Sequence, residues 1–394
     1  MSHAEKHTGS FRQTVRRELS RYSHDWIYFF SFFLAPAFAF VLFSTLMSSS
    51  APTQYPVGVV DQDNSSSSRQ LVRLLSAFQM TDVTARYPDI SQATDAVQRG
   101  TIYGFYYIPR HFAADANAQR QPKLSFYTNN SVLLAASMSM KDFKVASELA
   151  SGSAQRTVLR ARGYSDEQTM PLIQPITIDV HAISNPWISY GVYLNTTLLP
   201  AVMMMMILLT TAYSVGSELK AGTAREWLHT SGDSLVTALT GKLLPQTLAF
   251  FSVGLLCNAI LYGYMHYPLN GVGLPSMLLA TLLLILASQA LGLFFIGMFP
   301  ILRYGLSLAT LWSVMSFSIT GFTFPVVAMH PSLQALANMF PLRHFYCIYT
   351  DQALNGYPMH YSLGSYLALL AFLLLPFLVL KRLRRALLTY QYVP

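Results

Sequence analysis

The sequence is short of charged residues. Asp, Glu, Lys and Arg make up 11% of its 394 residues, and hydrophobic residues make up 52%, whereas soluble domains average about 25% charged residues. No charged residue occurs between Lys242 and Arg303. Because a charge at the centre of a bilayer costs roughly 2.5–3.5 kcal/mol on insertion scales, long charge-free apolar stretches mark places where a chain crosses a membrane. The composition excludes a soluble protein and predicts an α-helical polytopic membrane protein.

Six stretches meet this criterion, and each is long enough, at about 1.5 Å per residue, to cross a hydrocarbon core about 30 Å thick. The predicted transmembrane helices are 26–47, 188–215, 243–265, 276–299, 304–324 and 362–380. The second to sixth therefore occupy residues 188–380. The third and fourth form a helical hairpin, because a turn rich in Pro, Asn and Gly at 267–275 separates them.

The positions of Lys and Arg near the ends of the spans predict the orientation of the chain. They gather in the N-terminal arm 1–25, in the loop 216–242, at Arg303 and in the tail 381–394. The connections on the other side, 266–275 and 325–361, contain only Arg343. Both termini are thus expected in the cytoplasm and residues 51–185 outside it. The net charge of +8 reflects this topology and gives no reason to expect nucleic-acid binding.

Cysteine is almost absent. The two cysteines are Cys257 and Cys347, and residues 51–185 contain none, so this segment cannot depend on disulfides for its stability. A cleavable signal peptide is not evident either, because the first apolar run begins only at Trp26 and is longer than a signal-peptide core. We expect that run to remain as an anchor.

Residues 51–185 are predicted to form an inserted α/β extracytoplasmic domain, long enough for a core of its own. The expected elements are strands at 55–60, 101–108, 123–128 and 176–181, a helix through Leu71, Leu74, Leu75 and Phe78, and a long helix at 138–162. The spacing of the apolar residues and the turn residues between them indicate these elements.

The cluster of Asp61, Asp63 and Asn64 resembles the start of a calcium loop. An EF-hand requires Gly at the sixth position and Glu at the twelfth, and this sequence has Ser66 and Val72 there. We therefore favour a turn and helix cap and predict no metal site. No catalytic residues are assigned.

The N-terminal arm is predicted to form an amphipathic helix at the membrane surface. Its apolar positions, at helical spacing, are Phe11, Val15, Leu19, Tyr22 and Trp26, and its basic positions on the other face are Arg12, Arg16, Arg17 and Arg21. This helix has two compatible roles: it anchors the chain at an anionic membrane surface, and it contacts a cytoplasmic partner.

The loop 216–242 contains the most informative short motif, Glu-x-x-x-Gly-Thr-x-x-Glu-x-Leu, directly after the second span. The motif residues, together with the tryptophan inside it, are Glu218, Gly222, Thr223, Glu226, Trp227 and Leu228. Thr223 is a suitable N-cap, with Glu226 as its partner in a capping box. The resulting short helix would present Trp227 and Leu228 for docking, although any cytoplasmic loop needs caps and charges.

This motif resembles the coupling segment of the ATP-binding-cassette (ABC) type-2 exporter permeases. A second segment supports the resemblance: Gly321-Phe322 followed by Pro325, and Pro341-Leu342 followed by Phe345. It is similar to the family pattern in which the chain turns back as short helices on the outer side, here in a re-entrant segment at 325–361. The large insertion after the first span points to the subgroup of the family that carries such a domain.

The resemblance implies a permease subunit of an exporter in the bacterial inner membrane, which moves an amphipathic, drug-like or lipid-like substrate out of the cytoplasm. It assigns coupling to the five motif residues and to Trp227. It also implies two copies of a separate ABC ATPase that hold ATP and Mg, a second permease of the same or a related kind, and docking of a periplasmic adaptor. This chain has no phosphate loop, since Gly241-Lys242 is followed by Leu, so it is expected to have neither ATPase activity nor a cofactor of its own.

Candidates for a substrate pathway lie in and after the spans. They are Asn195, Met203, Met206, Phe317, Phe322 and Phe324. Methionine is flexible and could form an adaptable wall, but we favour helix packing or lipid contact for these methionines. Asn195 is more simply explained as a polar contact between helices. Near the outer surface we expect Arg343, His344 and Asp351 to pair with one another, although they could line an exit.

Two other functions are consistent with the sequence. A scaffold of the cell envelope would bind a partner through residues 51–185. A membrane-embedded enzyme would use His330, His344 and Asp351, although these residues fit no hydrolytic motif.

Overall fold

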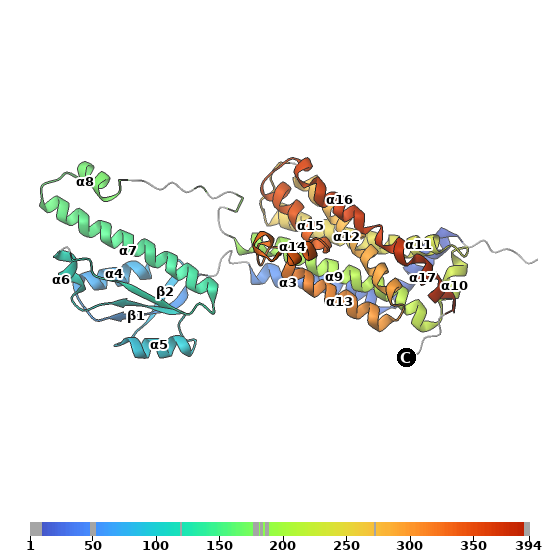
Figure 1. Ribbon diagram of the computed structural model, residues 1–394, viewed down its shortest axis with the longest axis horizontal. Coiled ribbons are helices and arrows are strands. Elements are labelled where there is room, and N and C mark those ends of the chain that lie inside the picture. Colours follow the sequence, from blue (N-terminus) through green and yellow to red (C-terminus); the bar gives the residue numbers. More distant parts are fainter. Residues whose placement is uncertain are drawn as a thin grey trace, which may run out of the picture. The chain divides into compact units, whose positions relative to one another are not determined.

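The computed structural model describes residues 10–47, 53–118, 120–175, 181, 184–185, 189–271 and 273–389. The chain divides into two compact units, one comprising residues 1–50 and 182–394 and the other residues 51–181. We call the first the helical unit and the second the α/β unit (Figure 1). The predicted strand at 176–181 lies outside the described residues except for His181.

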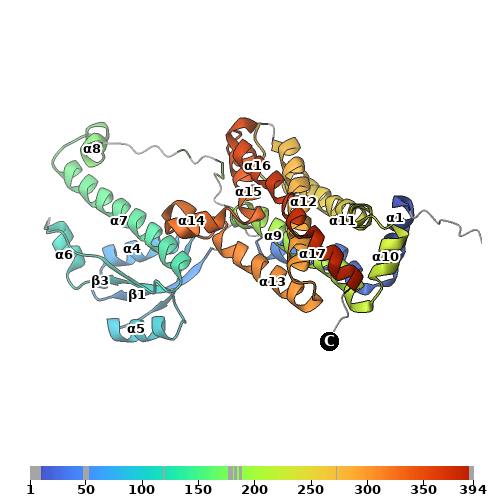
Figure 2. The same cartoon turned by 45° about the vertical axis from the view of Figure 1, so that its right-hand side comes forward.

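The helical unit is built from long helices joined by short helical turns (Figure 2). Its elements are α1 (Phe11–His24), α2 (Trp26–Phe29), η1 (Phe30–Leu34), α3 (Ala35–Leu46), α9 (Tyr190–Ala221), α10 (Ala224–Thr230), α11 (Leu235–Asn258), η2 (Ala259–Tyr264), α12 (Gly273–Met298), α13 (Leu302–Ile319), η3 (Val326–Ala328), α14 (Pro331–Ala337), α15 (Pro341–Ile348), η4 (Tyr349–Leu354), η5 (Met359–Ser362), α16 (Leu363–Phe372) and α17 (Leu375–Thr389). η1, η2 and η4 are π-helical turns, and η3 and η5 are 3-10 turns.

Five helical segments among the described residues are long and apolar enough to cross a membrane. They are Trp26–Leu46, Tyr190–Ala221, Leu235–Tyr264, Gly273–Met298 and Met359–Thr389. They overlap the first, second, third, fourth and sixth predicted spans. The chain is therefore mainly helical and carries the several apolar helices of a multi-pass membrane protein.

The predicted fifth span, 304–324, corresponds to α13, which ends at Ile319 and is not among these five segments. Arg303 and several Ser and Thr residues make α13 less apolar than the five candidate spans. α13 nevertheless packs along α9. The count of six spans stays a prediction.

Helices α9 and α12 form the centre of the helical unit. In their most apolar stretches 67% and 78% of the residues are buried, against 17% to 28% in the other three candidate spans. The side chains of Met204, Ile207 and Leu284 are fully buried there. Gly292 allows close packing, because a Cβ atom at this position would lie 3.0 Å from the carbonyl oxygen of Leu208. The other three spans leave most of their apolar surface uncovered by protein, as lipid-facing helices do.

The α/β unit contains one four-stranded sheet with strand order β2-β1-β3-β4. Its elements are β1 (Tyr55–Asp61), α4 (Ser66–Ser76), β2 (Thr81–Arg86), α5 (Ile90–Gln98), β3 (Gly104–Ile108), α6 (Phe112–Asn117), β4 (Ser125–Thr128), α7 (Leu133–Ala161) and α8 (Asp166–Ile173). β1 pairs parallel with β2 and β3, and β3 pairs antiparallel with β4. Four of these elements, β2, α5, α6 and α8, were not predicted from the sequence.

Each face of the sheet has its own apolar core. On one face Val59 and Tyr106 pack with Leu75 of α4 and Ala146 of α7. On the other face Val60 and Phe105 pack with α5, and Figure 1 shows α5 on the opposite side of the sheet from α4 and α7. The unit therefore has a core separate from that of the helical unit.

The predicted turn after β1 is present. The Asp61 carboxylate accepts hydrogen bonds from the backbone N–H groups of Asp63 and Asn64, both at 3.0 Å, and from the Ser68 hydroxyl at 2.7 Å. The Ser65 side chain caps α4. The carboxylate oxygen atoms of Asp61 therefore stabilise the turn that leads into α4.

Separate cores lead to a testable difference between the units. Leu75 is buried, so Leu75→Ala should destabilise the α/β unit by about 2–5 kcal/mol through the lost contacts and the cavity left behind. Hydrogen exchange read by mass spectrometry should then accelerate in β1 and α4 but not in α9 or α12. The exposed Val145→Ala is the control and should change neither. Equal acceleration in α9 and α12 would contradict the separation of the cores.

Candidate functional site

Helix α1 lies against α11 in the helical unit. It begins with a capping box, in which the Ser10 side chain accepts from the Gln13 backbone and the Gln13 side chain accepts from the Ser10 backbone. Thr14 and Glu18 are fully buried, whereas Phe11 and Leu19 are 42% and 55% exposed. The predicted helix exists, but the face that packs against the protein is the polar one.

The basic residues of α1 divide between two directions. Arg12 and Arg16 are exposed, but Arg17 and Arg21 turn inward and are only partly exposed. The prediction that all four share an outward basic face is therefore wrong for these two. Phe11 and Leu19 lie beside the buried face and are exposed, as an interfacial helix requires, whereas Val15 is partly buried.

A buried lysine lies at the centre of the site. The Lys242 ammonium lies 2.6 Å from Glu18 Oε1 and 3.0 Å from Glu218 Oε1. The side chains of all three residues are 0% exposed. Because an isolated charge is very costly to bury, each of these groups needs the others in place.

Two arginines of α1 complete this charge cluster. The Arg17 guanidinium donates to both oxygen atoms of Glu218, at 2.8 and 3.1 Å, and Arg21 donates to Glu218 and to the Ser217 hydroxyl. Burial by itself lowers the pKa of Arg17, but the hydrogen bond and the charge of Glu218 more than offset this, so its pKa is raised and Arg17 remains charged. We call Arg17, Glu18, Arg21, Glu218 and Lys242 the charge cluster; it joins α1, α9 and α11.

Helix α10 is attached to the same cluster. The Thr223 hydroxyl donates to Glu218, and the Lys242 ammonium lies 4.6 Å from the centre of the Trp227 ring, a cation–π contact. The hydroxyls of Thr14 and Ser231 are 2.9 Å apart. Four helices therefore meet around Lys242.

A glycine makes the close approach of α1 possible. A Cβ atom at Gly241 would lie 2.8 and 2.9 Å from the Thr14 side chain, a distance that real contacts do not reach. Tyr22 adds a hydrogen bond from its hydroxyl to the carbonyl oxygen of Lys242, at 2.9 Å. The backbone of α11 is thus shaped to accept α1.

The predicted capping box of α10 is not formed. α10 begins at Ala224, and Thr223 makes no side-chain cap because its hydroxyl is used by Glu218. Gly222 instead ends α9, with a φ of 71° in the left-handed region that glycine tolerates. Glu226 is exposed.

The predicted docking role of Trp227 and Leu228 is also wrong. Trp227 is 0% exposed and Leu228 is 3% exposed, and both pack in a core with Val215 and Leu219 of α9 and Leu387 of α17. Glu218 is likewise buried and cannot touch a partner. These residues hold α10 in place.

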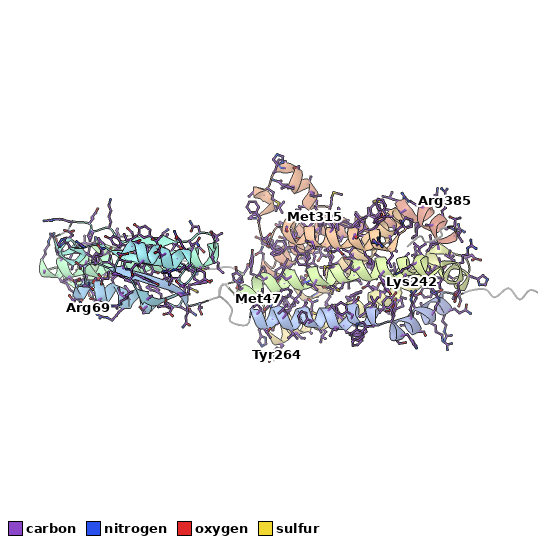
Figure 3. All side chains as sticks on the ribbon, turned by 90° about the horizontal axis from the view of Figure 1, so that it is seen from below. Met47, Arg69, Lys242, Tyr264, Met315 and Arg385 are labelled. Carbon is purple, nitrogen blue, oxygen red and sulfur yellow. The ribbon has the colours of Figure 1, made fainter. Side chains whose placement is uncertain are left out.

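The surface that α10 leaves free is polar. It carries Arg225, Glu226 and His229. The Arg225 guanidinium also donates to the carbonyl oxygen of Leu388, at 2.9 and 3.2 Å, which ties α10 to the basic end of α17. Figure 3 shows Lys242 and Arg385 of α17 toward one end of the helical unit and Met47 and Tyr264 toward the other.

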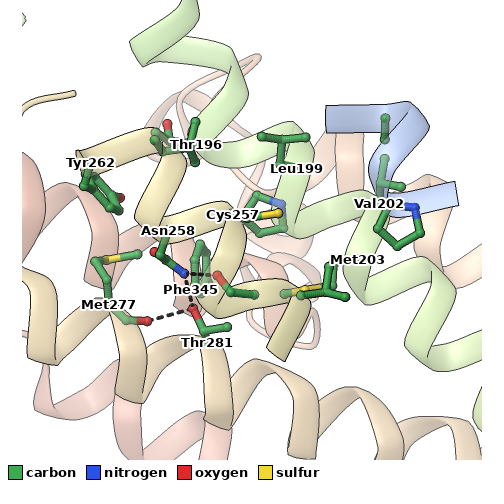
Figure 4. A pocket seen from close by; sticks show the side chains of 16 residues that line it. Thr196, Leu199, Val202, Met203, Cys257, Asn258, Tyr262, Met277, Thr281 and Phe345 are labelled. Carbon is green, nitrogen blue, oxygen red and sulfur yellow. Dashed lines mark hydrogen bonds between the residues drawn. The ribbon is translucent and has the colours of Figure 1, made fainter. Parts of the chain in front are cut away.

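The candidate pathway residues do not come together. Asn195 is buried and donates to the Tyr267 hydroxyl at 3.0 Å, Met203 and Met206 are buried in the core, Phe317 packs against that core, Phe322 is buried and Phe324 is 52% exposed. Only Met203 of the six lines a cavity of about 40 Å³ between α3, α9, α11 and α12 (Figure 4). A cavity of this size holds a few water molecules at most.

The expected pairing of Arg343, His344 and Asp351 is wrong. Arg343 donates to the carbonyl oxygen of Thr320 at 2.9 Å, a His344 ring nitrogen is 2.9 Å from the carbonyl oxygen of Asn338, and Asp351 accepts from a serine hydroxyl. Each of the three fastens a different part of the re-entrant segment. His330, the remaining residue of the enzyme alternative, caps α14, and its ring nitrogen lies 2.8 Å from the Ser332 hydroxyl. His330, His344 and Asp351 therefore have separate partners and do not make the shared contacts that a membrane-embedded enzyme would need.

Comparison with protein families identifies the chain. Residues 26–380 match the model of a family described as ABC-2 family transporter protein. The chain belongs to this family. It is a permease subunit of an ABC transporter and works with an ABC ATPase subunit. A search of curated proteins found no match.

The match begins at Trp26 and therefore includes Glu218 and Lys242 but not α1. Sequence reasoning missed Glu18 and Lys242 as members of the site. Two signals could have found them: Glu18 is an acid in a basic arm, and Lys242 is a cation directly before a charge-free apolar run.

The balance of charges in the cluster can be tested. Lys242→Met removes the buried cation that Glu18 and Glu218 share. Glu218 keeps Arg17 and Arg21, but Glu18 keeps only Arg17, at 3.1 Å, so the helical unit should be destabilised by up to about 3–5 kcal/mol. The double variant Lys242→Met, Glu18→Gln should recover part of this loss. Thermal unfolding in detergent measures both, with the exposed Lys220→Met as control. Equal stability of the single variant and the parent would contradict the cluster.

The fit of α1 against α11 can be tested separately. Gly241→Ala should push α1 away from Thr14 and expose Arg17 and Arg21 to trypsin, which raises cleavage several-fold. Thr14→Gly in the same chain should restore protection, because it removes the atoms that clash. Gly263→Ala, where a Cβ atom would have no heavy atom within 4 Å, is the matched control.

Proposed function

We propose that this permease subunit belongs to an exporter that moves an amphipathic, drug-like or lipid-like substrate out of the cytoplasm or the inner leaflet. The observation that carries the proposal is the charge cluster, because it locks α1 and α10 onto α9 and α11. Helix α9 is also the central helix of the unit, packed against α12 and α13. A displacement applied to α10 or α1 would therefore reach the centre of the bundle.

In this mechanism the ATPase contacts the free face of α10. Arg225, Glu226 and His229 offer it charged and polar groups, and the exposed residues of α1 lie next to them in the same assembly. A displacement of α10 would move α9 through the core around Trp227 and through the hydrogen bond from Thr223 to Glu218. ATP and Mg belong to the ATPase, which supplies the energy.

The proposed topology places both termini in the cytoplasm of a bacterial cell, with six spans in the inner membrane and the α/β unit outside. The basic residues of α1, the loop 216–242 and α17 support this orientation through the positive-inside rule. Two ATPase copies and a second permease complete the transporter, and an adaptor outside the membrane is a further proposed partner.

The substrate path is proposed to form between this chain and the second permease. Support comes from two spaces in the described helical unit. The cavity of about 40 Å³ is too small for an amphipathic substrate, whereas an apolar cleft of about 580 Å³, lined by Phe294, Trp312 and Phe372, opens to the surface. Phe324 and the partly buried Phe317 remain the candidates from the sequence that have surface to contribute to such a path.

The first experiment is purification of the tagged chain from its own membrane. We expect an ABC ATPase to co-purify in stoichiometric amount, with vanadate-sensitive activity, and outward transport to require both subunits. Recovery of the chain alone with an envelope protein and without ATPase activity would favour a scaffold instead. Substrate movement into the cell would overturn the export direction.

The docking face of α10 yields a specific prediction. Glu226→Ala with His229→Ala should lower the affinity for the ATPase about tenfold and leave the melting temperature unchanged, because both side chains are exposed. Trp227→Ala should instead lower the melting temperature, because loss of this buried side chain destabilises the helical unit by about 3–5 kcal/mol. Binding is measured by titration of the purified subunits.

The matched control for this experiment is Arg99→Ala, an exposed change in the α/β unit. Unchanged ATPase binding in the Glu226 and His229 variant would show that the motor docks elsewhere.

A further inference from the structure

The α/β unit carries a cleft of about 770 Å³ along the C-terminal half of α7. The segment from Arg120 to Leu124 and α6 bound it on one side, and Tyr164 and Leu172 bound it on the other. Figures 1 and 2 show α6 and α8 on either side of this half of α7. Small-molecule sites usually occupy about 300–1,000 Å³, so the cleft has the volume of a ligand pocket.

The cleft forms because α7 extends beyond the sheet, and the face that packs on the sheet continues into this extension. The last fully buried residue of α7 is Ala146. The same helical face then runs on through Ala150, Ala154 and Val158, which line the cleft. These side chains are small or of moderate size, so they leave the volume open. Leu124 and Leu172 add apolar surface from the two sides.

The charge in the cleft has one sign. Its lining includes Arg120 and Arg162 but neither Asp nor Glu. Among the described residues Arg162 has no ion-pair partner, and Arg120, whose side chain is 77% exposed, has only Asp115 at 3.6 Å. The nearby Arg156 and Arg160 differ, because both pair with Asp166. The two arginines of the cleft are thus available to an anionic ligand.

We propose that the cleft binds a single-chain acidic amphiphile, with its hydrocarbon chain along α7 and its anionic head group at Arg120 and Arg162. Guanidinium groups bind carboxylate and phosphate strongly through paired N–H donors. The apolar wall of Ala150, Ala154 and Val158 suits a hydrocarbon chain and would bury it from water. A fatty acid and a lysophospholipid share this chemistry.

A photoreactive palmitate analogue, with a diazirine in its chain and an alkyne at its end, tests the proposal on the full-length protein held in nanodiscs of phosphatidylcholine. We expect labelling within residues 112–172, mapped by mass spectrometry. Arg120→Ala with Arg162→Ala should reduce it about tenfold or more, since each charge-assisted bond contributes substantially. Ala154→Trp should reduce it similarly by filling the cleft.

Matched controls separate binding from misfolding. Ser153→Trp adds the same bulk to a neighbouring position that does not line the cleft, and Arg99→Ala removes a cation elsewhere in the unit; both should label like the parent. Ala154 is exposed on α7, so its variant should keep the melting temperature of the parent.

Competition identifies the head group. Unlabelled palmitate and lysophosphatidic acid should compete, the stronger one naming the preferred anion, whereas palmityl alcohol should not. Equal competition by the alcohol, or labelling that Ala154→Trp leaves unchanged, would overturn the proposal. The assay contains no ATPase and no ATP, so its result does not depend on the transport proposal.

Discussion

Lys242 is the group on which the mutual arrangement of α1, α9, α10 and α11 depends. A lysine with no exposed surface is tolerable only while carboxylates compensate its charge, and here they come from Glu18 on α1 and Glu218 on α9. The carboxylate of Glu218 needs Arg17 and Arg21 in turn. No member of the cluster can leave without stranding another, so α1, α9 and α11 hold a single mutual position.

This constraint gives one end of the helical unit directional polar contacts, whereas the middle is packed mainly by apolar side chains. At the end, charge-assisted hydrogen bonds and the buried Trp227 ring link four helices. Further along, α9 and α12 pack through Met204, Ile207 and Leu284, side chains without directional contacts. The π-helical turns η1 and η2 interrupt the spans at α3 and α11. A permease that passes on movement from one side to the other benefits from rigidity where the load enters.

Charge-free length predicted most of the fold, because the cost of burying charge in lipid depends on composition alone. The direction in which each side chain faces within the helical unit was harder to predict. An apolar pair such as Trp227 and Leu228 in a loop is equally suited to pack on a partner protein or on the same chain, and only the structure shows that α9 and α17 cover it. The inward turn of Arg17 depends on Glu218, which is 201 residues away in the chain.

In the α/β unit, local sequence patterns predicted the strands that are apolar but did not predict the polar strand β2. β1 and β3 carry buried Val, Ile and aromatic residues, but β2 reads Thr-Asp-Val-Thr-Ala-Arg, as an edge strand with a solvated face does. Such a strand is recognised only once β1 offers it a partner. The charge cluster was hidden for the same reason, since each of its members looks like an ordinary cation or acid in its own segment.

The sequence separation within the cluster has a consequence for biosynthesis. Glu18 and Lys242 are 224 residues apart, and chains lengthen at about 5–20 residues per second. Helix α1 must therefore wait, with Glu18 unpaired by Lys242, while the α/β unit is made and α9 and α11 are inserted. The helix that is translated first is among the last to find its final contacts.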